Sequence, residues 1–244
     1  MSRLWDEPRF QAVFRDYVSA GTFNEEKDYY PRYRSRYRDV LKLYASLAPS
    51  TPQMVLDVGG GQLGLLCKLL WEDQAEAADI GGPHLDYLRH QGVQAFNWNL
   101  CSSAQPVQNR YDVVFFSEVI EHLPIPGHIP LERLRVTLKS DGILICTTPN
   151  LYRPRNIIYL LLGIKIFDYF RFPTEGGLGH VVEYSHDHLG WQLEHAGFSD
   201  VQVKFHQVRH SPNNLFFRVL YWLGRPIFRI ERFRDNLFAV AHSP

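Results

Sequence analysis

The first residues that could do chemistry are a carboxylate and the glycines that follow it. Asp57 lies at the end of a short apolar run, and Gly59, Gly61 and Gly64 come directly after it. Glycines between a strand and a helix permit a tight turn and let a ligand approach the main chain closely. The glycines also satisfy the G-x-G-x-x-G spacing of dinucleotide sites, with Asp79 about 20 positions further on. The segment therefore predicts a nucleotide-like cofactor.

Asp57 separates two cofactor classes. A carboxylate just before the glycine turn would repel a pyrophosphate, but it could hold an ammonium group directly or through water. S-adenosylmethionine carries an α-ammonium and no phosphate, so Asp57 favours this cofactor over NAD. An NAD-binding oxidoreductase is the alternative, and a glycine turn that serves only the fold is another.

The second group is the Glu-x-x-Glu-His cluster in Ser117-Glu-Val-Ile-Glu-His-Leu123. If this segment is a helical turn, Glu118, Glu121 and His122 stand at i, i+3 and i+4 on one face and could converge on one cation. Alternatively, Glu118 and His122 are catalytic without a metal, with His122 as general base because imidazole titrates near neutral pH. A purely structural role is the third interpretation.

Alternating strands and helices must position both groups. A strand at 54–58 precedes the glycine turn, and the strongest strand signal, at 111–116, precedes the Glu-x-x-Glu-His cluster. Such alternation implies parallel pairing, right-handed crossovers and a sheet covered on both faces. An amphipathic helix at 24–48 lies outside the sheet. The other expected strands are 75–80, 93–99, 142–148, 201–208 and 237–241, with helices after Gly61 and at 83–90, 131–138 and 187–196.

The sequence resembles the class I S-adenosylmethionine-dependent methyltransferases. The resemblance rests on the hydrophobic-Asp-x-Gly-x-Gly pattern, on Asp79 at a strand end and on Asn97-Trp-Asn-Leu100, and it runs from about Tyr29 to Ala241. It implies an α/β, Rossmann-like sheet of seven strands, mostly parallel, with an antiparallel last strand and helices on both faces. Two departures are Leu63 in place of the third glycine and Asn99 in place of the usual acid near adenine.

The resemblance also implies the cofactor contacts. Gly59 and Gly61 would pass under the methionine portion, Asp79 would bind the ribose hydroxyls, and an arginine of the leading helix would meet the cofactor carboxylate. Arg36 is favoured for that role over Arg34 and Arg38. The implied cofactor-binding set is Arg36, Asp57, Gly59, Gly61, Asp79, Asn99, Leu100 and Ser117.

A finer resemblance concerns the Glu-x-x-Glu-His cluster. The same spacing occurs in the ubiquinone-biosynthesis O-methyltransferases and in the small-RNA 3′-terminal methyltransferases, where these positions resemble divalent-metal ligands. His180 falls where the RNA enzymes have another histidine. The resemblance therefore implies Mg²⁺ or another divalent cation bound by Glu118, Glu121, His122 and His180.

The whole chain, 1–244, is expected to form one methyltransferase domain. It would comprise a leading helical segment (1–50), a cofactor-binding half (51–149) and two substrate-cap insertions (150–184 and 210–236). Both insertions are apolar, aromatic and edged by arginine. We expect cap helices over the mouth of the site, and peripheral contact with a membrane surface is the alternative.

Composition narrows the function class. Lys plus Arg and Asp plus Glu both number 26, so no global field favours nucleic acid or an anionic membrane. The start of the chain lacks a signal-peptide pattern, which predicts a cytoplasmic protein. The longest apolar run, Ile157 to Ile164, is shorter than the roughly 18 residues of a membrane span. The sequence carries no signal for an oligomeric state.

The function we expect is O-methylation of a small molecule, a glycan or a lipid-linked intermediate. The acceptor atom is inferred only from the Glu-x-x-Glu-His resemblance. The alternatives are an RNA ribose 2′-O-methyltransferase with a Glu/Glu/His/His metal site, an NAD-binding oxidoreductase and a non-catalytic protein that binds S-adenosylmethionine.

Overall fold

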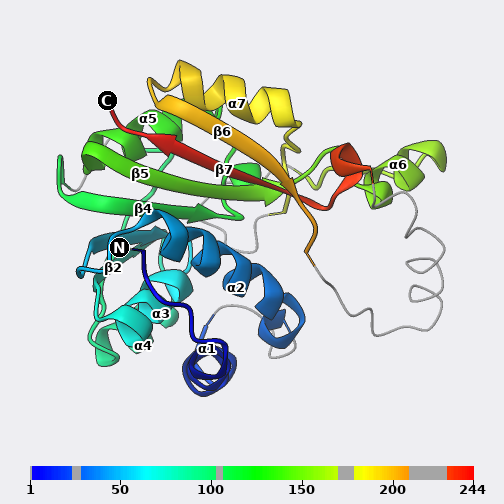
Figure 1. Cartoon of the computed structure of the whole chain (residues 1–244). Helices are drawn as coiled ribbons and strands as arrows, with labels where there is room; N and C mark the ends of the chain where they lie inside the picture. Colours follow the sequence, from blue (N-terminus) through cyan, green and yellow to red (C-terminus); the bar gives the residue numbers. More distant parts are fainter. Residues whose placement is uncertain (1, 24–28, 103–106, 170–178, 209–229) are drawn as a thin grey trace.

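A computed structural model describes residues 2–23, 29–102, 107–169, 179–208 and 230–244, and its seven strands form one sheet (Figure 1). The strand order is β3-β2-β1-β4-β5-β7-β6, and β7 is antiparallel to both of its neighbours. The predicted Rossmann-like sheet with an antiparallel last strand is therefore confirmed. The strands are β1 (Met54–Val58), β2 (Gln74–Asp79), β3 (Gln94–Asn97), β4 (Tyr111–Ser117), β5 (Leu138–Pro149), β6 (Ser199–His206) and β7 (Asn236–His242).

Helices cover both faces of the sheet. On one face, α2 and α3 pack on Val113 and Phe115 of β4, whereas α5 and α7 pack on Val114 and Phe116 on the other. Both faces of this central strand are buried, which explains its continuous apolar run. The helices are α1 (Glu7–Val13), α2 (Tyr29–Leu47), α3 (Gln62–Trp71), α4 (His84–His90), α5 (His128–Thr137), α6 (Pro154–Leu161) and α7 (His186–His195).

The leading segment holds more structure than the helix expected at 24–48. In α2, Tyr37, Val40, Leu41 and Tyr44 are buried at spacings of three and four, as an amphipathic helix requires. Before it come α1 and the π-helical turn η1 (Phe14–Ser19), whose bounds the sequence did not predict.

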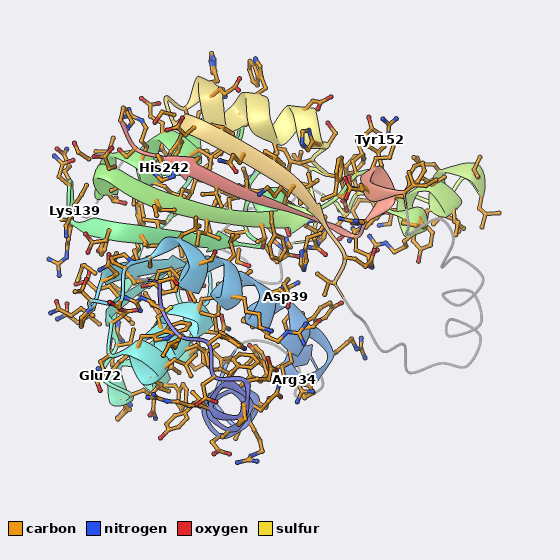
Figure 2. The ribbon with its side chains drawn as sticks, viewed as in Figure 1. Arg34, Asp39, Glu72, Lys139, Tyr152 and His242 are labelled. Atoms are coloured by element: carbon orange, nitrogen blue, oxygen red, sulfur yellow. The ribbon has the colours of Figure 1, made fainter. Side chains whose placement is uncertain are left out.

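The carboxyl ends of the parallel strands meet at one edge of the sheet, here called the carboxyl edge. Val58, Asp79, Asn97 and Ser117 are the last residues of β1 to β4. Open α/β sheets bind their ligands at this edge, and the predicted cofactor-binding residues lie at or next to these strand ends. Helix α6 projects beyond it in Figure 1, and Tyr152 lies at this end of the sheet in Figure 2.

The two expected insertions are described only in part. Residues 150–184 contain α6 and return to the carboxyl edge at Gly179, but residues 170–178 lie outside the described residues. Of 210–236, the portion 210–229 lies outside them too, and the remainder contains the 3₁₀ turn η4 (Glu231–Phe233) and the start of β7. The predicted cap role therefore stays a prediction. Among the described helices, none combines the length and apolar character needed to cross a membrane.

Candidate active site

The turn between β1 and α3 consists of three glycines with positive φ, and Gly59 and Gly61 are also closely packed. Gly59 and Gly61 have φ of +96° and +81°, in the range that L side chains rarely adopt. A Cβ on Gly59 would overlap Val119, and one on Gly61 would overlap Leu88. Gly59 N–H donates to the carbonyl oxygen of Ala78 at 2.9 Å, which fixes the turn against β2. The turn is a preformed main-chain cradle beside the carboxyl edge.

Asp57, in β1, holds the two ends of this turn together by a hydrogen bond to the start of α3. The side chain is buried, and its Oδ2 accepts from the N–H of Gly64 at 3.0 Å. Burial raises the pKa of Asp57 to about 6, against the lowering effect of the N–H groups of Gly64 and Leu63. A Cβ on Gly64 would lie 3.2 Å from Asp57 Cβ, which favours glycine at position 64.

Asp79 ends β2 with its carboxylate partly accessible. Oδ1 accepts from the N–H of Gly81 at 3.4 Å, and Oδ2 lies 3.4 Å from Nε2 of His84. His84 is 1% exposed, and neither ring nitrogen has a hydrogen-bond partner among the described residues. Sequence reasoning missed His84; the available signal was a histidine at the start of the helix that follows β2.

The other predicted cofactor-binding residues, Asn99, Leu100 and Ser117, lie at the same edge. Trp98 N–H donates to the carbonyl oxygen of Asp79 at 2.7 Å, which brings Asn99 and Leu100 beside the end of β2. Asn99 Oδ1 accepts a hydrogen bond from the main-chain N–H of Cys101 at 2.8 Å, and Leu100 is buried. Ser117 Oγ lies 2.7 Å from Oγ1 of Thr147 on β5.

Arg36 is buried, unlike the other two candidate arginines of α2. Its Nη1 donates to Oε2 of Glu118 at 3.0 Å and its Nη2 to the hydroxyl of Tyr29 at 2.6 Å. Arg34 is exposed (Figure 2), and Arg38 pairs with the neighbouring aspartate at 2.8 Å. The structure therefore brings Arg36, rather than Arg34 or Arg38, to the site.

Glu118, the fourth residue of the predicted metal set, is not among the three whose ligand atoms lie within 4.8 Å of one another, and its carboxylate is held by other side chains. Its φ is +57°, and the 3₁₀ turn η2 (Ile120–His122) begins only two residues later, so one helical face is not formed. Glu118 Oε1 instead accepts from Thr147 Oγ1 and Asn236 Nδ2, each at 3.0 Å, and Oε2 faces Arg36. A non-glycine residue in this conformation is strained, and the polar contacts hold it there.

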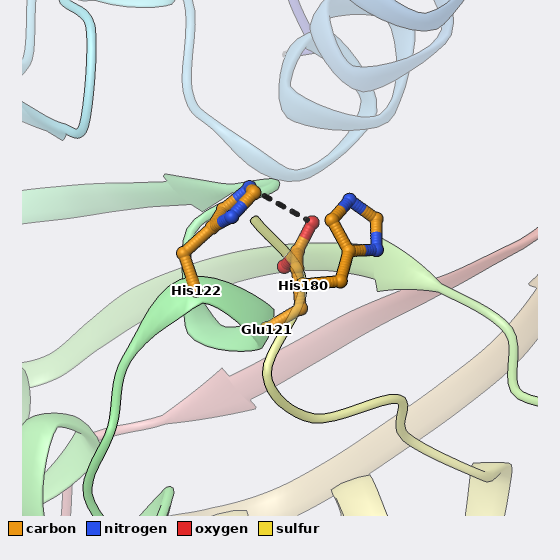
Figure 3. A group of neighbouring side chains, drawn as sticks. All are labelled: Glu121, His122 and His180. Carbon is orange, nitrogen blue, oxygen red and sulfur yellow. Dashed lines mark ion pairs between the residues drawn. The ribbon is translucent and has the colours of Figure 1, made fainter. Parts of the chain in front are cut away.

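The other three predicted ligands do converge. One ligand atom each of Glu121, His122 and His180 lies within 4.8 Å of the others. Figure 3 shows the two imidazole rings on either side of the Glu121 carboxylate, whose Oε1 is 3.9 Å from Nε2 of His122. Glu121 is 1% exposed; its Oε2 accepts from Thr148 Oγ1 at 3.0 Å, but Oε1 has no hydrogen-bond partner among the described residues. Burial, and then the charge of Glu118, raise the pKa of Glu121 well above its ordinary value.

Oxygen atoms behind the two histidines orient their rings. His122 Nδ1 lies 3.1 Å from the carbonyl oxygen of Gly179, and His180 Nδ1 lies 3.0 Å from Oε1 of the buried Glu183. A carbonyl can only accept, so His122 Nδ1 carries the proton, and the carboxylate favours the same tautomer in His180. In each ring, Nε2 is then the nitrogen that carries the lone pair. Metal-binding histidines are commonly held in this way.

The segment 179–184 reaches this cluster through main-chain contacts. The N–H groups of Val181 and Val182 donate to the carbonyl oxygen of Glu121 at 2.9 and 3.1 Å. Sequence reasoning identified His180 but missed Glu183, whose charge also holds Arg153 at 2.5 Å. The i, i+3 spacing of His180 and Glu183 was the available signal.

Comparisons with known proteins identify a family and a shared fold. A family model described as a methyltransferase domain matches residues 30–203. No curated protein matches the sequence. The chain is similar to the solved structure of an S-adenosylmethionine-dependent methyltransferase from Archaeoglobus fulgidus, with 19% identity and a TM-score of 0.56, over 88% of this chain and 100% of that one.

Two further solved structures are similar to this chain. Phosphoethanolamine N-methyltransferase 2 of Haemonchus contortus, in complex with S-adenosylmethionine, has 14% identity and a TM-score of 0.58, over 86% of this chain and 52% of that one. An S-adenosylmethionine-dependent methyltransferase from Mesorhizobium loti has 13% identity and a TM-score of 0.53, over 85% and 95%. At these identities the likeness shows a shared fold.

Proposed function

We propose that this chain transfers a methyl group to a hydroxyl oxygen of its acceptor. The chain belongs to the methyltransferase-domain family and is an S-adenosylmethionine-dependent methyltransferase. The acceptor class we infer is a small molecule, a glycan or a lipid-linked intermediate. Family membership sets aside the NAD-dependent alternative. The balanced charge gives no support to an RNA acceptor.

The cofactor fits the residues at the carboxyl edge. A Cβ at Gly59 or Gly61 would overlap Val119 or Leu88, so glycine keeps the turn tight at the end of β1, where the cofactor would lie against the main chain. Asp79 keeps a partly accessible carboxylate for ribose hydroxyls, and Arg36 has guanidinium donors beyond the two already used. Asp57 holds the turn in shape through the N–H of Gly64. When bound, the cofactor supplies a methyl group on a positively charged sulfur.

A divalent cation fits Glu121, His122 and His180. The observation that carries this proposal is a buried carboxylate oxygen without a hydrogen-bond partner among the described residues, flanked by two histidines whose Nδ1 atoms face oxygens. Carboxylate and imidazole ligands suit Mg²⁺, Mn²⁺ and similar ions. A cation held there would lower the pKa of an acceptor hydroxyl. Glu118 and Arg36 contribute a second, ion-paired layer beside this cluster.

The same cluster favours an oxygen acceptor over an amine. A hydroxyl must lose its proton to become a good nucleophile, and the side chains at this site can promote that loss. Without a cation, the lone pair on His122 Nε2 could accept the proton directly as a general base. Methyl transfer is an in-line displacement, so positioning and exclusion of water supply much of the rate in either case.

Calorimetric titration with Mn²⁺ and with Mg²⁺ tests the metal site. We expect one site in the unaltered protein, and binding at least about tenfold weaker in Glu121→Gln and in His180→Gln. His195→Gln is the matched control, because His195 is an exposed histidine on α7 outside the cluster. Equal binding by Glu121→Gln and the unaltered protein, or no binding by either, would rule out this site and leave the general-base role of His122.

A further inference from the structure

The segment Pro154 to Tyr169, here called the α6 arm, exposes a run of large apolar side chains. Leu161 and Leu162 are 82% and 67% exposed, and helix α6 projects away from the body of the molecule (Figure 1). Single exposed apolar residues are common, but a contiguous group of this kind marks a binding surface. The exposed members are Ile158, Leu160, Leu161, Leu162, Ile164, Phe167 and Tyr169.

Hydrogen bonds hold the arm in a defined shape. At its base, the buried Asn156 donates from Nδ2 to the carbonyl oxygen of Leu151 at 3.1 Å. At its tip, Leu162 N–H donates to the carbonyl oxygen of Ile158 at 3.1 Å, and Ile164 N–H donates to that of Tyr159 at 2.7 Å. The exposed leucines therefore stand on an ordered turn at the end of a helix.

The arm has two cationic residues, Arg155 and Lys165, and one acidic residue, Asp168. Arg155, at the base of the arm, lies 3.9 Å from the carboxylate of Glu183, and Lys165 lies near the tip. The carboxylate of Asp168 accepts from the main-chain N–H of His180 at 3.1 Å, and Lys165 Nζ lies 3.9 Å from the ring centroid of the exposed Tyr169. An aliphatic tip with a lysine and a tyrosine beside it matches the interface of an anionic bilayer. Leucine is under-represented among the residues that dominate protein–protein interfaces, which argues against a protein partner.

We propose that the α6 arm docks the protein on an anionic lipid surface, with the leucines of its tip among the acyl chains and its cations at the headgroups. The arm is tied to the site, because Asp168 N–H donates to the carbonyl oxygen of His180 at 2.8 Å. Docking would therefore hold the carboxyl edge close to the lipid surface. One consequence rests on the proposed function: the acceptor is an amphiphile presented from that surface.

Vesicle co-sedimentation with the full chain tests the proposal. The probes are vesicles of phosphatidylcholine alone and vesicles that also contain phosphatidylglycerol. We expect binding to the anionic vesicles that weakens with added salt, and a loss of at least about tenfold in Leu161→Glu. Leu4→Glu is the matched control, because Leu4 is 90% exposed near the amino terminus and should leave binding unchanged.

Three results would overturn the proposal. The first is the absence of binding to anionic vesicles by the unaltered protein, and the second is equal binding by Leu161→Glu. The third is self-association, measured by sedimentation velocity, that Leu161→Glu abolishes while vesicles are not bound, which would assign the arm to a second copy. Titration of the same variants with S-adenosylmethionine and Mn²⁺ measures the proposed function separately, so the two proposals can fail independently.

Discussion

At the scale of single residues, Asp57 shows how one carboxylate serves fold and site together. The sequence predicts that Asp57 holds an ammonium group, and in the structure its Oδ2 accepts a hydrogen bond from the N–H of Gly64. Its negative charge still lies at the end of β1, beside the glycine cradle. A role in cofactor binding thus acts through the shape of the turn, through its charge, or through both, and two substitutions separate these contributions.

Asp57→Ala should weaken S-adenosylmethionine binding by about tenfold or more, which corresponds to roughly 1.4 kcal/mol. The substitution removes both the charge and the acceptor for Gly64. Asp57→Asn keeps an acceptor oxygen and removes only the charge. If calorimetry finds full affinity in Asp57→Asn and reduced affinity in Asp57→Ala, the carboxylate acts through the turn alone. Unchanged affinity in both variants would remove Asp57 from the site.

The pKa of Asp57 also predicts a pH dependence of stability. Burial raises this pKa from 3.8 to about 6, so the folded state binds the proton more tightly than the unfolded chain does. The stabilisation by this proton is fully present below the unfolded value and is lost as the pH rises through about 6. Chemical denaturation across this range should show the corresponding slope in the free energy of unfolding, and Asp57→Asn should reduce it.

At the scale of elements, the glycine turn joins β1 to α3 and carries the cofactor cradle. Its glycines combine positive φ with close packing, because Val119 lies against Gly59 and Leu88 against Gly61. Gly163, at the end of the α6 turn, has a φ of +67° but nothing within 4 Å of the position of a Cβ. These glycines therefore share a backbone demand and differ in packing.

Gly59→Ala should lower the free energy of unfolding by more than Gly163→Ala does. The conformational cost of alanine at positive φ is about 1–2 kcal/mol, and Gly59→Ala adds the displacement of Val119. Denaturant titration measures both, and calorimetry should find cofactor binding lost only in Gly59→Ala. Equal costs, with cofactor binding retained in both variants, would contradict the cradle.

The elements differ in how far the sequence predicts them. Strands β1 and β4 could be predicted because both of their faces are buried, which gives continuous apolar runs in the sequence. Their predicted ends agree with the observed ones to within a few residues. The left-handed φ of Glu118 could not be predicted, because it depends on contacts with Thr147 and Asn236, which lie far from Glu118 in the sequence. The same holds for Glu183, whose role depends on the tertiary placement of His180.

At the scale of the whole molecule, the carboxyl edge gathers the cofactor cradle, the Glu121 cluster and the base of the α6 arm. The glycine turn follows β1, the cluster follows β4, and α6 follows β5, so neighbouring strands deliver all three to one edge. This convergence supports a cofactor, a cation and an acceptor that meet there. Parallel strand order explains it, because parallel strands end on the same side.

Calorimetric titration of the unaltered protein with S-adenosylmethionine, S-adenosylhomocysteine and NAD, each with Mg²⁺ and with EDTA, tests the central claim most directly. We predict dissociation constants on the order of micromolar for the first two ligands and no binding of NAD. Binding of NAD with none of S-adenosylmethionine would contradict the assignment of the glycine turn and of the function built on it.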